Sequence, residues 1–256
     1  MGIPARTDAF TFYSLASISF LESTVATYVR NLEPFFARDD DTRRWLRDVW
    51  LPEESSHGRR TRDFVARTWP GFEWERGYAR FVAAYGPRCD HALLRPSPAL
   101  EALARCVTET ETAMIYRCLA DYAGDAELSA LLREMSADEV RHYGYFRRVF
   151  ERYDARERNS TWRKARTLVA RSELVRDEDV RLAFLPLNAC WRAAPPFARL
   201  DFDEYLARAA EVMAEHFPLE EAQRMLFRPL RHGRWFERRL VSLLGRIVRR
   251  QFELAA

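Results

Sequence analysis

Two Glu-x-x-His motifs are the residues of this chain best suited to chemistry. Glu54 and His57 lie in the stretch Glu-Glu-Ser-Ser-His, and Glu139 and His142 lie in Asp-Glu-Val-Arg-His. Residues three apart share one face of a helix, so each motif presents a carboxylate and an imidazole to the same point in space. These groups are common ligands of first-row metals. Two such helices facing each other would form a site for two metal ions.

A further carboxylate is expected on a helix between Phe12 and Phe36. Glu22 lies within the apolar stripe of this segment rather than opposite it. A buried, unpaired carboxylate is costly or takes up a proton, so a metal or another cation is a reasonable partner for it. Glu22 is therefore a candidate ligand. The stripe is formed by Leu15, Ile18, Val25, Ala26 and Val29.

The segment from Pro98 to Tyr122 predicts another helix, which offers two acidic residues. Glu109 and Glu111 point about 200° apart around a helix, so only one of them can face the core. We choose Glu111 because its neighbours at helical spacing are apolar, and Glu109 stays the alternative. The neighbours of Glu111 are Val107, Met114, Ile115 and Cys118.

The distances along the chain are consistent with two helical hairpins. Ligands on antiparallel helices share a level only if they lie about equally far from the turn. Glu111 lies 124 − 111 = 13 residues before the turn at Gly124, and Glu139 lies 139 − 125 = 14 residues after Asp125. In the first hairpin, the intervals from the run 39–41 are 39 − 22 = 17 and 54 − 41 = 13 residues. Pro52 should kink or bulge its helix beside Glu54, or begin a new helix.

The motifs Glu-Glu-x-x-His-Gly (53–58) and Asp-Glu-x-Arg-His (138–142) resemble those of soluble acyl-carrier-protein desaturases, within the ferritin-like di-iron carboxylate superfamily. The likeness covers about residues 11–155. The interval 139 − 111 = 28 residues is shorter than in the desaturases and is similar to that of aldehyde-deformylating oxygenases and other small di-iron oxidases. The resemblance implies a ferritin-like four-helix bundle that holds two iron ions, with manganese or a mixed Mn/Fe pair as alternatives.

Roles for single residues follow from the resemblance alone. It implies bridging carboxylates at Glu54 and Glu139, and terminal imidazoles at His57 and His142. It also implies two terminal carboxylates, Glu22 and Glu111. The remaining histidines have no partner at ligand spacing, and we expect them to be surface or structural residues: His91, His216 and His232.

The expected function is that of an O2-dependent di-iron oxidoreductase of the desaturase, oxygenase or oxidase type. Its substrate would be a hydrophobic or small organic molecule, because apolar residues are predicted to line the site: Ile18, Trp50, Met114, Ile115, Tyr143 and Phe146. A first alternative is a ferroxidase, an iron-storage protein or a peroxide-scavenging ferritin-like protein, which would use the same ligands. A second alternative is a non-catalytic helical interaction protein without metal.

The composition favours an all-α protein. Nine glycines in 256 residues, with many Leu, Ala, Arg and Glu, predict a single helical domain over 1–256. Within it we expect the di-iron bundle at 11–155 and a helical extension at 156–256 packed on the bundle. No apolar run approaches the roughly 20 residues that span a bilayer, and the amino terminus lacks a signal pattern. The expected location is the cytoplasm.

Electrons for the reaction must come from an external donor. The four cysteines form no Cys-x-x-Cys pair, which excludes a zinc ribbon or a rubredoxin-like centre, and Cys106 and Cys118 are expected to fill the core. The net charge of +3, with Arg interleaved among acids, predicts no nucleic-acid partner. Three basic groups are candidate docking sites for an acidic carrier protein, such as acyl carrier protein, or for a reductase, with ordinary helix surface as the alternative: Arg59, Arg60 and Arg62; Arg147 and Arg148; Arg163, Lys164 and Arg166.

The rest of the chain predicts a long crossover followed by extra helices. Residues 69–98 are rich in Trp and Pro, with a short helix expected from Glu75 to Tyr85. Long crossovers occur in ferritin-like folds. The last helix has an apolar side beside arginines, so it would dock on the protein's own core, on a second subunit in a homodimer, or on an anionic membrane. The later helices are expected at 160–175, 178–190, 201–216, 219–228 and 233–252.

Overall fold

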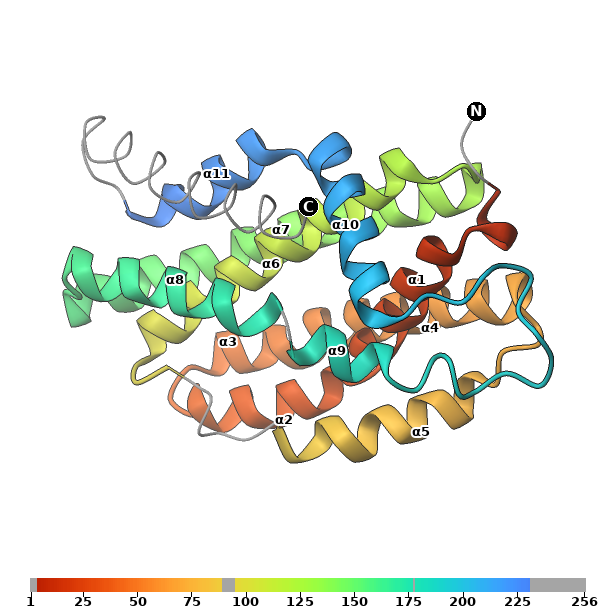
Figure 1. Cartoon of the computed structure of the whole chain (residues 1–256). Helices are drawn as coiled ribbons and strands as arrows, with labels where there is room; N and C mark the ends of the chain where they lie inside the picture. Colours follow the sequence, from red (N-terminus) through yellow and green to blue (C-terminus); the bar gives the residue numbers. More distant parts are fainter. Residues whose placement is uncertain (1–3, 89–94, 177, 231–256) are drawn as a thin grey trace. The chain divides into compact units, whose positions relative to one another are not determined.

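The computed structural model describes residues 4–88, 95–176 and 178–230, and the regular structure of these residues is helical (Figure 1). The one β-type feature found there is an isolated antiparallel bridge between Phe72 and Trp191. The predicted all-α class is therefore confirmed. Among these residues, no helix has the length and apolar character needed to cross a membrane.

The chain divides into two compact units, and each draws on distant parts of the sequence. Unit 1 comprises Met1–Leu94, Ala123–Leu131 and Leu174–Phe202. Unit 2 comprises Arg95–Tyr122, Leu132–Glu173 and Asp203–Ala256. These boundaries differ from the expected division at residue 155, since both units contain residues from either side of it. The grouping of the whole chain into one domain stays a prediction.

Unit 1 is organised around the antiparallel pair α1 and α4 (Figure 1). The end of α1 at Glu22 lies against Gly58, and the Phe12 ring lies 5.2 Å from the Trp69 ring, just beyond α4. The buried rings of Phe12 and Phe20 anchor α1 in the core. The main helices are α1 (Ala9–Glu22), α2 (Val25–Phe35), α3 (Asp40–Trp45), α4 (Leu51–Thr68), α5 (Trp74–Tyr85) and α9 (Glu178–Phe184).

The single helix expected between Phe12 and Phe36 is instead broken directly after Glu22. The break follows from two hydroxyl groups that bond to the preceding turn. Ser23 Oγ donates to the carbonyl of Ser19 at 2.6 Å, and Thr24 Oγ1 donates to the carbonyl of Leu21 at 2.6 Å. Side chains of this kind compete with the backbone for helix hydrogen bonds. As a result, Glu22 occupies the last position of α1 rather than the middle of a helix.

The irregularity predicted at Pro52 is present. A π-helical turn, η2 (Leu46–Trp50), joins α3 to α4, and the amide of Leu51 donates to the carbonyl of Leu46, five residues back. Proline has no amide hydrogen to continue the ordinary pattern, and its ring crowds the preceding turn. The extra residue in the turn changes which side chains face the core, and both Leu46 and Trp50 are buried.

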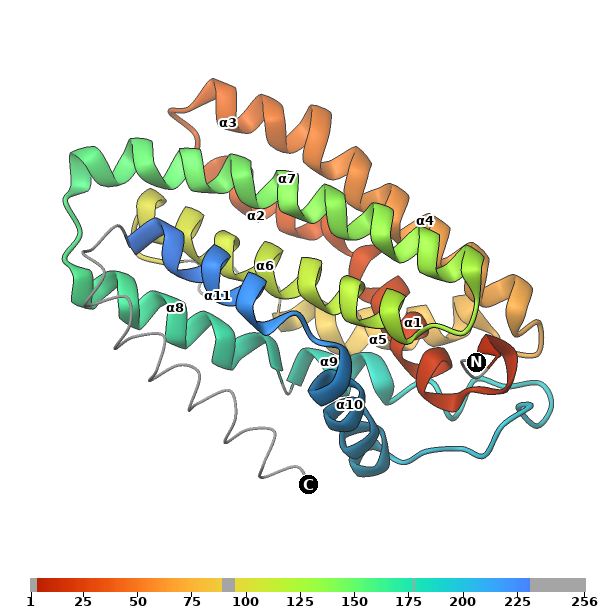
Figure 2. The same ribbon diagram turned by 90° about the horizontal axis from the view of Figure 1, so that it is seen from above.

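Unit 2 is organised around the antiparallel pair α6 and α7 (Figure 2). Ser136 Oγ donates to the carbonyl of Ala113 at 2.8 Å, and Arg133 forms an ion pair with Asp121 near the turn. The predicted bounds Pro98–Tyr122 and the predicted turn at Gly124-Asp125 are confirmed. The helices are α6 (Pro98–Tyr122), most of α7 (Ala126–Glu157), most of α8 (Thr161–Arg176), α10 (Phe202–His216) and α11 (Leu219–Phe227).

The four helices predicted between residues 157 and 230 are found, with one difference. The helix expected at 178–190 ends at Phe184, because Pro186 and the following turns stop it. The short helix expected from Glu75 to Tyr85 is confirmed as α5. The expected helix at 233–252 lies outside the described residues, as do Cys89, His91 and His232.

Candidate metal centre

The candidate ligands form one triplet of two glutamates and a histidine in each unit. Each triplet takes a Glu-x-x-His pair from one helix and a third carboxylate from the antiparallel neighbour of that helix. In each triplet, one ligand atom per residue can be chosen such that the three atoms lie within 4.8 Å of one another. The first triplet is Glu22, Glu54 and His57, and the second is Glu109, Glu139 and His142.

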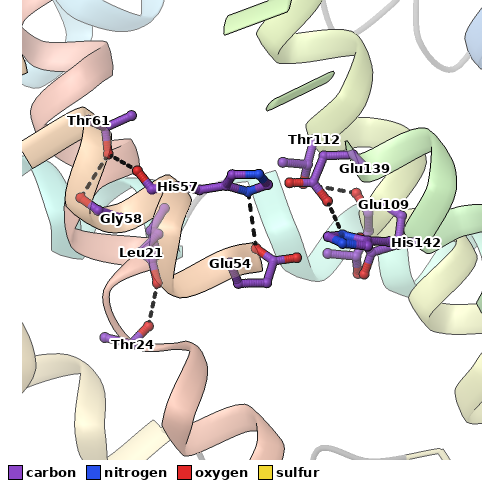
Figure 3. A network of polar contacts seen from close by, with 11 residues as sticks. Leu21, Thr24, Glu54, His57, Gly58, Thr61, Glu109, Thr112, Glu139 and His142 are labelled. Carbon is purple, nitrogen blue, oxygen red and sulfur yellow. Dashed lines mark hydrogen bonds and ion pairs between the residues drawn. The ribbon is translucent and has the colours of Figure 1, made fainter. Parts of the chain in front are cut away.

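The first triplet lies where α4 meets the end of α1. Glu54 and His57 are on the first turns of α4, and Nδ1 of His57 lies 3.7 Å from Oε2 of Glu54 (Figure 3). Both side chains are buried, with 6% of Glu54 and 1% of His57 exposed, whereas Glu22 is half-buried. The hydroxyl of Thr61 donates to the carbonyl of His57 at 2.7 Å, which ties the backbone of this candidate ligand to the next turn.

Gly58 allows this approach of α4 to α1. A Cβ atom at this position would lie 2.9 Å from both N and Oγ of Ser23, and 3.1 Å from the carbonyl carbon of Glu22. Distances below 3.0 Å to backbone atoms require the helices to move apart. The glycine that ends the motif Glu-Glu-x-x-His-Gly is therefore needed for the close packing of α4 against α1. This packing lets Glu22 reach the motif.

The second triplet lies midway along two uninterrupted helices. Glu109 is on α6, and Glu139 and His142 are on α7. Nδ1 of His142 lies 3.0 Å from Oε2 of Glu139 and 3.5 Å from Oε2 of Glu109 (Figure 3). All three residues are at most 2% exposed. Two carboxylates this deeply buried around one imidazole repel each other unless a cation or protons are shared between them.

The structure places Glu109, and not Glu111, in the second triplet. We chose Glu111 on the assumption that the apolar face of α6 points toward the other ligands. Other helices of unit 2 cover that face instead. Met114 packs with Ala222 of α11, and the Cys118 thiol lies 3.7 Å from the carbonyl of Val212 of α10. Since α6 is buried on several sides, apolar neighbours could not identify the side that faces α7. Glu111 is half-buried.

Two groups beside the second triplet, the Cys106 thiol and the Tyr143 phenol, have pKa values above their ordinary range. Burial, with the Glu109 carboxylate as the next cause, raises the pKa of the Cys106 thiol well above its ordinary value. Burial likewise raises the pKa of the Tyr143 phenol, which donates a hydrogen bond to the carbonyl of Met225 at 2.7 Å. A protonated thiol is a poor ligand and a poor nucleophile. This agrees with the expected role of Cys106 and Cys118 as core residues, and both are buried.

Four of the six apolar residues predicted to line the site are buried. Trp50, Met114, Tyr143 and Phe146 are at most 5% exposed, whereas Ile18 and Ile115 are half-buried. The sequence did not single out the buried ion pair of Glu101 and Arg105, which lie 2.8 Å apart one turn of α6 away from the triplet. A glutamate and an arginine four residues apart on a helix often form an ion pair, so their spacing in the sequence could have indicated this one.

Both triplets suit a transition metal by their chemistry. Carboxylate oxygens and imidazole nitrogens bind iron and manganese, and the acidic majority of each triplet would balance the charge of a divalent ion. A buried Glu/His group able to hold a metal ion is thus present in each unit. Comparison with models of protein families gave no match for this chain, and a search among curated proteins found no similar sequence.

Proposed function

We propose that the two triplets together hold two iron ions, as the dinuclear centre of a ferritin-like four-helix bundle formed by α1, α4, α6 and α7. The support for this proposal is that the same three residue types occur in both triplets. Each triplet combines a Glu-x-x-His pair with one carboxylate from a neighbouring antiparallel helix. This is the ligand pattern of di-iron carboxylate bundles. Glu22, Glu54, His57, Glu109, Glu139 and His142 would be the ligands.

The proposed activity is O2-dependent oxidation of a hydrophobic or small organic molecule. The observation that carries it is the deep burial of the acidic triplets, since Glu54, Glu109 and Glu139 are at most 6% exposed. A buried centre among aromatic side chains keeps water from a reaction on an organic molecule. When bound, the two irons would supply the electron transfer that O2 needs to react with an organic molecule.

The protein's own residues hold the ligands and limit the access of water. Thr61 fixes the backbone at His57, and Gly58 lets the end of α1 approach. The buried rings of Trp50 and Phe146 contribute apolar surroundings. The three cysteines among the described residues are free and buried, so we assign electron supply to an external donor.

Metal analysis combined with oxygen uptake tests the proposal. The protein is reconstituted with ferrous iron without oxygen, the metal per chain is counted, and oxygen is then added with and without fatty acyl, aldehyde or amine substrates. We expect two irons per chain, an absorption change on adding oxygen, and uptake that depends on one class of substrate. Glu134→Gln, at an exposed acid of α7, is the control for Glu139→Gln, which should lose metal.

Two outcomes would contradict this function. Absence of bound transition metal after reconstitution would favour a helical interaction protein. Oxygen uptake that needs only ferrous iron, with iron accumulating beyond two per chain, would favour a ferroxidase or storage protein.

A further inference from the structure

The corner between α7 and α8 in unit 2 is strongly basic at its surface. Between residues 152 and 166, every arginine is exposed, and the sequence of this stretch contains two acids, Asp154 and Glu157. Ser160 directly precedes α8, and its hydroxyl accepts from the amide of Arg163 at 3.3 Å. We call this surface the basic corner; its arginines are Arg152, Arg156, Arg158, Arg163 and Arg166.

The two acids of the corner do not neutralise its surface. Asp154 forms an ion pair with Lys164 and accepts from the amide of Asn159 at 3.1 Å. Glu157 accepts from the Ser97 hydroxyl at 2.5 Å and from the amide of Ala99 at 3.1 Å. Both carboxylates are therefore used to join α7 to α8 and to the start of α6. The outward charge of the basic corner comes from its five arginines.

Trp162 lies within the basic corner with 71% of its surface exposed. It is the most exposed of the large apolar side chains in the described part of the chain. Tryptophan and arginine are enriched among the residues that contribute most to protein interfaces. One exposed aromatic ring among arginines offers too little apolar surface for an amphipathic helix that inserts into a bilayer. The composition thus fits a protein partner with an acidic surface.

Another surface of unit 2 has the complementary charge. Along α10 and the start of α11, five carboxylates are exposed, and Arg208 is the one Lys or Arg between residues 203 and 221. The charge of Arg208 is shared locally, since its guanidinium donates to Glu211 at 2.6 Å. We call this surface the acidic face; its residues are Asp203, Glu204, Glu211, Glu215 and Glu220.

We propose that the basic corner of one copy of this chain binds the acidic face of a second copy. The chain carries both halves of this contact, with five exposed arginines against five exposed carboxylates. Single exposed ion pairs contribute little, but several acting together steer association and set its partner. Burial of Trp162 would add the apolar part of the interface. If the basic corner of each copy binds the acidic face of the other, the two copies form a closed dimer. If only one of these two contacts forms, the copies associate into open chains.

Sedimentation of the full-length protein at low and high salt tests this interface. We expect association at about 0.05 M salt that weakens at least about tenfold at about 0.5 M, because salt screens exposed charges. Arg163→Glu/Arg166→Glu and Glu211→Arg/Glu215→Arg should each lose association by a similar factor. Arg67→Glu/Arg80→Glu, which reverses two exposed arginines of unit 1, should leave it unchanged.

Mixing the two reversed variants provides the decisive comparison. Each variant alone has lost the charge of one half of the contact, but a mixture brings the unaltered basic corner of one variant to the unaltered acidic face of the other. We expect the mixture to associate at low salt, and the fluorescence of Trp162, isolated by difference from Trp162→Phe, to shift to shorter wavelength. A wild-type protein that is monomeric at low salt, or a mixture that fails to associate, would overturn the proposal. Restored association also shows that both variants are folded.

Discussion

The two triplets are made of the same residue types, but the backbone that supports them differs. In unit 2, Glu109, Glu139 and His142 lie in the middle of two long, regular helices, and all are buried. In unit 1, Glu22 ends a helix, while Glu54 and His57 follow a π-helical turn and a proline. A regular helix pair positions ligands through its repeat, whereas an irregular one depends on particular neighbouring atoms. The first triplet should therefore be the more sensitive to changes outside its ligands.

The largest effect is expected from removing a carboxylate from either triplet. Glu54→Ala and Glu139→Ala should each reduce bound iron from two per chain to less than one, because the resemblance assigns bridging roles to both. This loss should exceed the about 10- to 100-fold weakening that follows removal of a residue behind a ligand. Elemental analysis after anaerobic reconstitution measures it. Equal metal content in wild type and both variants would rule out the shared centre.

The next comparison separates the two acids of α6. Glu109→Gln should lower iron content strongly, whereas Glu111→Gln should retain it, because the structure places only Glu109 in a triplet with His142. Both changes remove one charge and keep the side-chain volume, so each is the control for the other. Metal titration of the two variants gives the answer. Loss of metal in Glu111→Gln but not in Glu109→Gln would show that Glu111 is the ligand, as its apolar neighbours predicted.

A smaller effect, specific to unit 1, is expected at Gly58. Alanine there overpacks the contact with Ser23, which should lower the free energy of unfolding by about 1–3 kcal/mol and weaken metal binding. Gly144 of α7 is the matched control, because a Cβ atom there has ordinary space, 3.8 Å from Nη1 of Arg148. Gly144→Ala should stabilise the helix by up to about 1 kcal/mol. Thermal or denaturant unfolding of the metal-free proteins measures both.

If Gly58→Ala and Gly144→Ala changed stability by the same amount, the close approach of α1 to α4 would not limit the first triplet. The metal content of Gly58→Ala then provides a second test. A folded variant with full iron content would show that Glu22 reaches the motif without this contact.

The smallest effect is expected at Pro52. The π-helical turn before it is already supported by the bond from the Leu51 amide to the Leu46 carbonyl and by the buried side chains of Leu46 and Trp50. Pro52→Ala should therefore lower stability by only about 0.4–1 kcal/mol, mainly through the greater freedom of the unfolded chain. Metal content should be unchanged. A large loss of iron would mean that the proline itself holds the turn that presents Glu54.

Local patterns were sufficient to predict most of the helices. The bounds of α6 and the turn at Gly124-Asp125 agree with the sequence because apolar periodicity, proline and glycine act within a few residues. The same is true of the two Glu-x-x-His pairs, since a spacing of three on a helix fixes which residues share a face. Pro52 likewise indicated an irregular turn before the structure showed its type.

What depended on distant residues could not be read in this way. The break after Glu22 brings a candidate ligand at a helix end against Gly58 of α4, a contact that no local pattern indicates, and the sequence alone allowed a continuous helix there. The apolar neighbours of Glu111 favoured it over Glu109, but α10 and α11 pack on the Met114 side of α6, and Glu109 is the acid that joins the triplet. The sequence by itself determined the helices and the type of donor groups, since both follow from nearest neighbours along the chain. Only the tertiary structure decided which carboxylates join each histidine, because that depends on which helix faces cover one another.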